Sequence, residues 1–145
     1  MSIRMPEGRT LVEGRATGTT LVLHAPLSFW GGLDPQTGEL IDTHHPQRGA
    51  LVTDRILVMP SGRGSSSSSY ILAEAIRAGT APAAIVLREP DGIVALGAIV
   101  ARELYGTRIP VVVLDPDGYE SIADGVAVEV RAEEDAATVN PANER

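Results

Sequence analysis

A run of serines follows two glycines near the middle of the chain and could supply hydroxyl groups for chemistry. The segment is Gly62-Arg63-Gly64, followed by five serines from Ser65 to Ser69. Serine hydroxyls and the Arg63 guanidinium are hydrogen-bond donors, and glycine lets a backbone turn sharply and approach a ligand closely. Together these residues predict a binding site for a carboxylate or a phosphate.

A strand and a helix are expected on either side of this turn. Ile56 to Met59 form a short apolar run of the kind found in buried strands, and Pro60 cannot continue a ladder. Apolar residues then recur at helical spacing from Tyr70 to Arg77, and Gly79 is placed to end the helix. The serines fall at the helix N-terminus, whose free N–H groups bind anions. A simple N-cap followed by a serine-rich linker explains the same segment, so both interpretations stay open here.

The next part of the chain repeats the strand and helix pattern. Pro82 to Leu87 and Pro110 to Leu114 are short apolar runs, and between them a helix is expected to begin after Asp91 and end at Gly106. Alternating strands and helices predict a parallel sheet with right-handed crossovers. The helix N-termini then open on the carboxyl edge of the sheet, where ligands of α/β proteins usually bind.

The two ends of the chain predict further strands. Residues 9–24 indicate two short strands around a turn, and residues 125–130 alternate like an edge strand. These strands could form a second, antiparallel layer. We expect a single domain over residues 1–131, and a flexible acidic tail over residues 132–145.

The stretch from Pro26 to Gly38 contains the only phenylalanine and the only tryptophan, Phe29 and Trp30. Its turn-forming residues predict a loop, yet large apolar side chains are costly to leave in water. Phe29 and Trp30 should therefore either fill the edge of the core or contact a partner. Asp34, which precedes a proline, is expected either to form a turn or to face a site.

Two adjacent histidines, His44 and His45, precede Pro46. A metal site is disfavoured because neighbouring histidines point to different sides and no second ligand stands at a metal-binding spacing. The preferred role for His45 is that of a loop histidine that forms hydrogen bonds or lines a site.

Composition excludes several classes of function. The chain has no cysteine, so it cannot itself ligate an iron–sulfur cluster or a thiolate–zinc centre. Its net charge of −7 argues against binding to nucleic acid or to an anionic membrane. No apolar run is long enough to span a bilayer, and a signal peptide's apolar core is lacking, so a cytoplasmic protein is expected.

Common nucleotide and hydrolase motifs do not fit the turn. No lysine follows the second glycine as in a Walker loop, Ser67 stands where a dinucleotide fingerprint needs its third glycine, and no Gly-x-Ser-x-Gly elbow is present. A hydrolase triad of Ser65, His45 and Asp34 can be written down, but no oxyanion-loop signature supports it.

Three segments taken together carry a family resemblance. The run Gly62–Tyr70, the upstream loop Pro26–Gly38 and the downstream segment Gly79–Ile85 resemble the small subunit, or swivel domain, of aconitase X. The resemblance extends from Glu7 to Leu114. It implies a swivelling β/β/α domain of three layers, with a central, largely parallel sheet and a smaller antiparallel layer.

The same resemblance implies an activity and a partner. Members of the family are dehydratases, in which the swivel domain closes over a large subunit that holds an iron–sulfur cluster and most of the substrate site. We therefore expect a heterodimer or a higher assembly, a small carboxylate substrate, and no cofactor or metal bound by this chain. The archaeal mevalonate 5-phosphate dehydratases usually have Gly-Ser-Thr after the turn, whereas this chain has Gly64-Ser65-Ser66. That departure favours the bacterial cis-3-hydroxy-L-proline dehydratases.

Residue roles follow by analogy with the aconitase swivel domain, whose catalytic serine directly follows a glycine at a similar turn. Ser65 is thus expected to be the general base. Arg63, Gly64 and Ser66 are expected to bind the substrate. Asp34 and His45 are further candidates that could line the closed interface.

Two alternatives belong to other classes. The helix N-terminus is also compatible with a non-catalytic anion-binding or regulatory module. His44 and His45 raise the possibility of a phosphohistidine type of swivelling domain, which is disfavoured because neither follows a Gly-x-Thr-Ser turn.

Overall fold

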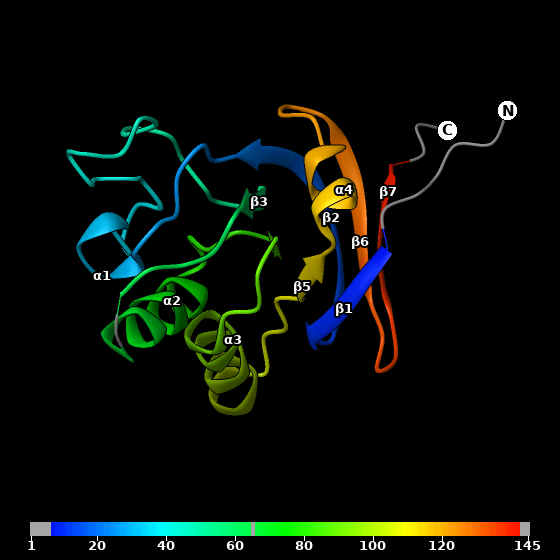
Figure 1. Cartoon of the computed structure of the whole chain (residues 1–145). Helices are drawn as coiled ribbons and strands as arrows, with labels where there is room; N and C mark the ends of the chain where they lie inside the picture. Colours follow the sequence, from blue (N-terminus) through cyan, green and yellow to red (C-terminus); the bar gives the residue numbers. More distant parts are fainter. Residues whose placement is uncertain (1–6, 65, 143–145) are drawn as a thin grey trace, which may run out of the picture.

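The computed structural model describes residues 7–64 and 66–142, and shows helices packed against strands that close into a barrel (Figure 1). The chain order of the elements is β1 (Glu7–Val12), β2 (Gly14–Val22), α1 (Phe29–Gly32), β3 (Ile56–Met59), α2 (Ser66–Ala78), β4 (Ala84–Leu87), α3 (Gly92–Tyr105), β5 (Val111–Leu114), α4 (Pro116–Glu120), β6 (Ala127–Ala132) and β7 (Ala137–Pro141). No helix in the described part of the chain has the length and apolar character needed to cross a membrane.

Four neighbouring strands form the predicted parallel sheet. β3, β4 and β5 pair in parallel order, and the last residues of β2 pair in parallel with β3. All four residues in each of β3, β4 and β5 are buried, as expected for short apolar strands that are covered on both faces. The helices α2 and α3 cover one face of this sheet (Figure 1).

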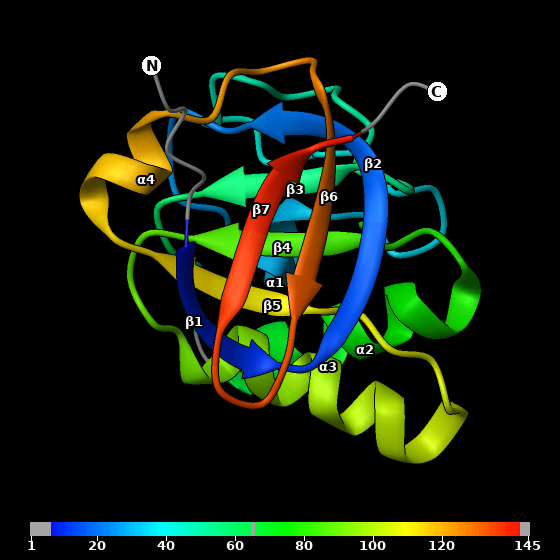
Figure 2. The ribbon, with the colours of Figure 1, turned by 90° about the vertical axis from the view of Figure 1, so that its right-hand side faces the viewer.

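Three antiparallel strands close the sheet into a barrel. The strand order is β1-β5-β4-β3-β2-β6-β7, with β1 pairing to both β5 and β7. Figure 2 shows β6 and β7 crossing in front of the parallel strands, with β1 and β2 curving along the two sides.

The α/β class and the parallel strands are confirmed, but the separate antiparallel layer is corrected. The antiparallel strands do not form a separate layer because β2, with nine residues, is long enough to pair with both regions. Its first part, Gly14–Thr19, pairs antiparallel with β6, and its last part, Thr20–Val22, pairs in parallel with β3. One long strand therefore belongs to both regions, and the two regions become one continuous barrel.

The core has two parts, one on each side of the parallel strands. Alternate residues of β3, such as Ile56 and Val58, point into the barrel and pack against buried residues of β6 and β7. The intervening residues, Leu57 and Met59, pack against α2 and α3. The order of helices, parallel strands and antiparallel strands thus resembles the predicted layers, although the strands form a single sheet.

The C-terminal part of the chain differs from expectation in two ways. β6 is not an edge strand, because it pairs with β2 on one side and with β7 on the other. The segment 132–145, expected to be a flexible tail, contains β7, in which Ala137 and Val139 are buried. Polar and acidic residues around Glu133 to Asp135 form the turn between β6 and β7, which explains why the segment resembled a tail.

The predicted end of α2 and both predicted ends of α3 are confirmed. Asp91 caps α3 by accepting hydrogen bonds from the N–H groups of Ile93 and Val94, and Gly106 ends that helix in the left-handed conformation. Gly79 follows α2 with a φ of +81°, and the Thr80 N–H bonds back to the Ala75 carbonyl. These contacts at the end of α2 and at the two ends of α3 fix the direction in which the N-terminus of α2 points.

Candidate functional site

The glycine turn lies at the carboxyl edge of the parallel strands, between β3 and α2. The Gly62 N–H donates to Asp91 Oδ2 over 3.0 Å, and the Arg63 N–H donates to the Leu27 carbonyl over 3.1 Å. The Arg63 carbonyl accepts a hydrogen bond from the Ser68 hydroxyl over 3.3 Å. Three different parts of the chain therefore hold the turn on the side that leads to Ser65. Ser65 itself, the predicted base, lies outside the described residues.

Gly64 occupies a position that a side chain would disrupt. Its φ of +106° is one that residues with a Cβ rarely adopt. A Cβ there would stand 2.7 Å from Ser28 Oγ and 3.0 Å from Ser68 Oγ. The backbone at Gly64 thus lies close to two serine hydroxyls of the chain itself, and its predicted close approach to a ligand stays a prediction.

The loop before β3 packs against this turn and α2. Phe29 is buried and belongs to the core between the strands and the helices, whereas Trp30 is 60% exposed. The Trp30 N–H donates to Ser68 Oγ over 3.2 Å, and the Ser28 hydroxyl donates to the Trp30 carbonyl over 3.0 Å. Phe29 therefore takes the first of the two predicted roles, at the core edge, whereas contact of Trp30 with a partner stays a prediction.

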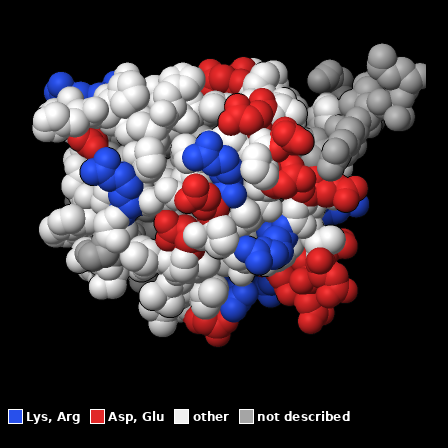
Figure 3. Space-filling model, viewed as in Figure 1, with Lys and Arg blue, Asp and Glu red and all other residues white. Residues whose placement is uncertain are grey.

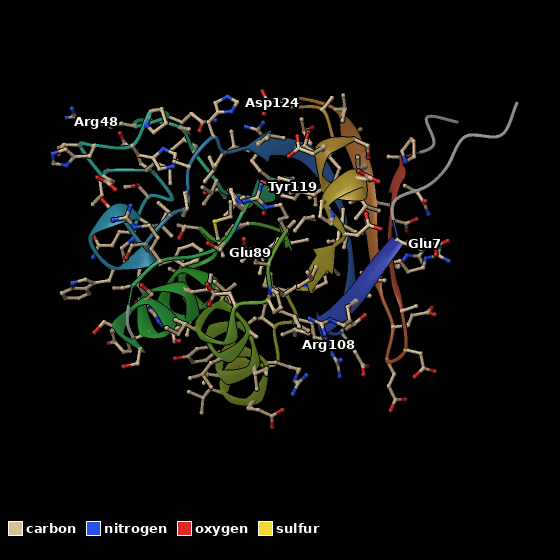
Figure 4. The ribbon with its side chains drawn as sticks, viewed as in Figure 1. Glu7, Arg48, Glu89, Arg108, Tyr119 and Asp124 are labelled. Carbon is tan, nitrogen blue, oxygen red and sulfur yellow. The ribbon has the colours of Figure 1, made fainter. Side chains whose placement is uncertain are left out.

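The loop after β4 supports the turn from the other side. The N–H groups of Arg88 and Glu89 both donate to the Pro60 carbonyl over 3.1 Å. Asp91 uses Oδ1 to cap α3 and Oδ2 to hold Gly62, so one carboxylate joins the turn to the start of α3. Figure 4 shows Glu89, which follows β4 at this edge, and Arg108, which precedes β5 at the opposite end of the parallel strands.

The start of α2 is open to an anion. Ser66 is the first residue of this 13-residue helix, and no acidic residue stands in its first turn. Arg63 and Ser66 are both exposed. In Figure 3 charged side chains crowd the side of the molecule on which β1, β6 and β7 lie, and the surface over α1 and α2 is mostly uncharged. An anion at the start of α2 would meet helix N–H groups, hydroxyls and a guanidinium.

Asp34 is not brought to the turn. Its Oδ1 accepts from the Gln36 N–H, and its carbonyl accepts from Gly38, as expected for a turn residue. The adjacent Pro35 carbonyl accepts a 2.6 Å hydrogen bond from Thr80 Oγ1, just beyond the C-terminus of α2. A helix of 13 residues is about 20 Å long, so Asp34 lies roughly a helix length from Ser66.

His45 is buried in a loop and has partners at both ring nitrogens. Its Nε2 lies 3.2 Å from the Ala25 carbonyl, and its Nδ1 lies 3.0 Å from the Gln47 N–H, which donates to it. This pattern requires the neutral tautomer with the proton on Nε2. Gln47 in turn bonds to His24 N and Val22 O, so His45 supports the loop that leaves β2. The predicted hydrogen-bonding role is the one that this geometry supports.

Sequence reasoning missed the two serines that join the site loops, Ser28 and Ser68. Ser28 lies in a segment whose residues predict only a loop. Ser68 lies in the serine run, which predicts a site without distinguishing its members. The signal that could have singled out Ser68 is its position in α2, five residues after Arg63 and on the buried face shared with Leu72.

Two hollows lie outside the turn. One, of about 280 Å³, lies between α2 and α3 and is bordered by Ser66, Ser69, Tyr70, Ala73, Glu74, Leu96, Val100, Leu104 and Tyr105. The other, of about 370 Å³, lies at the opposite end of the strands and is lined by residues 13–15, Arg108 and residues 131–134. The first adjoins the start of α2, and its lining is mainly apolar.

The part of the chain that the structure describes offers no ligand set for an iron–sulfur cluster or a metal ion. Cysteine is absent from the sequence, and the described residues contain no group of three His, Cys, Asp or Glu side chains close enough to hold a metal.

Comparisons with known proteins agree on one family. The family model of the aconitase X swivel domain matches residues 5–139. The crystal structure of Thermococcus kodakaraensis aconitase X (holo-form) has a TM-score of 0.80 and 36% sequence identity, covering 92% of this chain and 98% of that chain.

Two kinds of dehydratase are similar in sequence. The cis-3-hydroxy-L-proline dehydratase of Pseudomonas aeruginosa is 55% identical over 106 residues, which are 73% of this chain and 18% of that protein. The phosphomevalonate dehydratase small subunit of Thermococcus sibiricus is 44% identical over 127 residues, which are 88% of this chain and 92% of that protein. The chain thus spans about a fifth of the first relative and nearly all of the second.

Proposed function

The chain belongs to the aconitase X swivel domain family, and from that premise we propose that it is the small subunit of a dehydratase. The observation that carries the proposal is the turn Gly62–Gly64, held at the start of α2 by groups from three parts of the chain. The turn offers donors to an anion and leads directly to Ser65. A large subunit is expected to supply the rest of the site.

The substrate that we propose is cis-3-hydroxy-L-proline, converted to 1-pyrroline-2-carboxylate. Its support is the 55% identity to the Pseudomonas aeruginosa dehydratase, against 44% for the Thermococcus sibiricus small subunit. The segment Gly64-Ser65-Ser66 supports the same choice, because the archaeal mevalonate 5-phosphate dehydratases usually have threonine where this chain has Ser66. Mevalonate 5-phosphate is the second candidate, since the chain matches nearly the full length of a phosphomevalonate dehydratase small subunit.

Ser65 is proposed as the general base that removes the proton from the carbon next to the substrate carboxylate. The 3-hydroxyl group gains a proton and leaves as water, so that the substrate loses one hydrogen and one hydroxyl overall, and the resulting enamine tautomerises to the cyclic imine. Carbon–hydrogen and carbon–oxygen bonds break while a carbon–carbon double bond forms, so no oxidant is needed. An iron–sulfur cluster in the large subunit would supply Lewis acidity for the departing hydroxyl.

The helix N-terminus alone cannot make Ser65 an effective base. A favourable helix start contributes at most about 2 kcal/mol, which corresponds to roughly 1.5 pKa units. That shift is far too small to ionise a serine substantially at neutral pH. Further positive charge is required, and Arg63, which is exposed within the turn, is a candidate in this chain.

Arg63, Gly64 and Ser66 are proposed to bind the substrate carboxylate. A guanidinium pairs well with a carboxylate, and the Ser66 hydroxyl lies at the helix start, where an anion is favoured. Asp34 and His45 are left out of this set, because the structure places the first near the far end of α2 and gives the second a role in a loop.

Trp30 is proposed to contact the large subunit. It is 60% exposed, and its backbone is bonded to the residue that also holds the turn. Tryptophan is enriched at buried contacts between proteins, whereas an isolated chain gains nothing from exposing so large an apolar surface. Closure of the domain onto the large subunit would bury Trp30 and, at the same time, bring the turn to the substrate.

The proposal is tested by producing the chain together with a matching cysteine-bearing large subunit and assaying dehydration. The pair should consume cis-3-hydroxy-L-proline, and this chain alone should be inert. Turnover of mevalonate 5-phosphate in its place would establish the second candidate. A soluble monomer that binds phosphate or a carboxylate, and captures no large subunit, would favour the non-catalytic anion-binding module.

A further inference from the structure

We propose that Ser68 is a positioning residue for the reaction, which fixes the catalytic turn and the Trp30 loop relative to each other. This inference rests on the proposed function, because it concerns the same turn. Ser68 need not touch the substrate. Its hydroxyl joins two segments that are 33 residues apart in the sequence at Trp30 and Arg63.

The contacts of Ser68 are unusual for a serine inside a helix. Its side chain is 2% exposed, and its Oγ donates to the Arg63 carbonyl over 3.3 Å while accepting from the Trp30 N–H over 3.2 Å. Ser28 Oγ lies 3.3 Å from Ser68 Oγ and donates to the Trp30 carbonyl. One buried hydroxyl thus has neighbours from the turn, from α1 and from the loop before it.

The lengths of these hydrogen bonds indicate that Ser68 contributes more to the position of the turn than to the free energy of unfolding. The Trp30 N–H bond of 3.2 Å lies at the long end of the usual range and the Ser68 O–H bond of 3.3 Å lies beyond it, so each should contribute only modestly to folding. The position of a catalytic group is a more sensitive quantity, because a small displacement costs far more rate than stability. Loss of the hydroxyl should therefore be felt mainly in the catalytic rate.

Ser69 provides a matched control on the same helix. It is also buried, at 7% exposure, and its hydroxyl donates to the Ile93 carbonyl of α3 over 2.7 Å. Ser69→Ala removes the same atom and a shorter hydrogen bond, but one that does not reach the turn or the Trp30 loop. Its cost in stability should equal or exceed that of Ser68→Ala.

The first measurement compares kcat and KM for the assembled pair of subunits carrying Ser68→Ala or Ser69→Ala. Ser68→Ala should lower kcat by about tenfold or more and raise KM as well, because the displaced turn carries the proposed carboxylate-binding residues and leads to the proposed base. Ser69→Ala should leave kcat within about twofold. Equal losses of kcat in the two variants would overturn the proposal.

The second measurement needs no activity. Trp30 is the only tryptophan, so its fluorescence in the isolated full chain reports the loop directly. Ser68→Ala should lower the fluorescence anisotropy of Trp30, because the N–H that holds its backbone loses its acceptor, and Ser69→Ala should not. Unchanged anisotropy in Ser68→Ala would contradict the proposal.

These outcomes separate the two levels of inference. A wild-type pair without dehydratase activity would count against the proposed function, whereas the anisotropy comparison would still decide the role of Ser68. If Ser68→Ala does not fold, Ser28→Ala replaces it, since Ser28 is only partly buried and its hydroxyl contacts Ser68 Oγ and the Trp30 carbonyl, so that its loss weakens the same network. A Ser28→Ala variant with wild-type anisotropy and wild-type kcat would then overturn the proposal.

Discussion

Tyr119 illustrates how burial changes the chemistry of a single residue in this barrel. It lies in α4 and packs against the core inside the strands (Figure 4). Burial raises the pKa of Tyr119 to about 12, and the positive charge of Arg88, 5.7 Å from the ring centre, only partly offsets that effect. The phenol is therefore neutral throughout the physiological range.

The shifted pKa of Tyr119 predicts a loss of stability in alkali. Between pH 10 and pH 12 the unfolded chain releases this proton and the folded chain keeps it, so the free energy of unfolding falls as pH rises. Two pKa units correspond to about 2 to 3 kcal/mol. Denaturant unfolding across this range should show the loss, and Tyr119→Phe should abolish it. An identical pH slope in the variant would contradict the assignment.

At the residue scale, the sequence predicts which side chains have a structural role better than it predicts the residues that they contact. Asp91 was recognised as a helix cap from its position before an apolar periodic run, but its second contact, with Gly62, depends on a neighbouring strand. Ser28 and Ser68 meet only because two loops converge on α2. Such contacts between distant segments leave no local pattern in the sequence.

At the element scale, strands and helices with strong local signals were predictable. β3, β4 and β5 are continuous apolar runs, and α3 is bounded by a capping aspartate and a terminal glycine. Closure of the barrel was not predictable, because β2 changes partners along its length and β7 resembles a polar tail. Pairing of strands depends on the whole sheet, whereas helix ends depend on a few adjacent residues.

The packing of α2 against α3 makes a prediction at this scale. A Cβ on Gly97 of α3 would stand 2.9 Å from the Ser69 carbonyl of α2, whereas a Cβ on Gly92 would meet nothing within 4 Å. Gly97→Ala should therefore lower the free energy of unfolding by about 1 to 3 kcal/mol. Gly92→Ala should be neutral, or should stabilise the chain by up to about 1 kcal/mol, through helix propensity.

Denaturant unfolding of the two alanine variants distinguishes helix packing from helix propensity. If propensity dominated, both substitutions would stabilise the chain. Greater stability of Gly97→Ala than of the wild type would show that the helices do not require this close approach.

At the scale of the whole molecule, the barrel presents one edge with the features of half an active site. The turn, the exposed Trp30 and the open start of α2 lie at the carboxyl edge of the parallel strands. The chain contains no cysteine to hold a cluster, and a helix start of about 2 kcal/mol cannot activate a serine alone. Family membership and these limits support the proposal that a larger partner supplies the remaining groups.

The most direct measurement is the activity of the assembled pair with Ser65→Ala. If Ser65 is the general base, kcat for cis-3-hydroxy-L-proline should fall by roughly 10²- to 10⁴-fold while the two subunits still copurify. Ser66→Ala, one residue further on, should instead raise KM with a smaller effect on kcat, because its proposed role is to bind the substrate. Full activity of the Ser65→Ala pair would contradict the account.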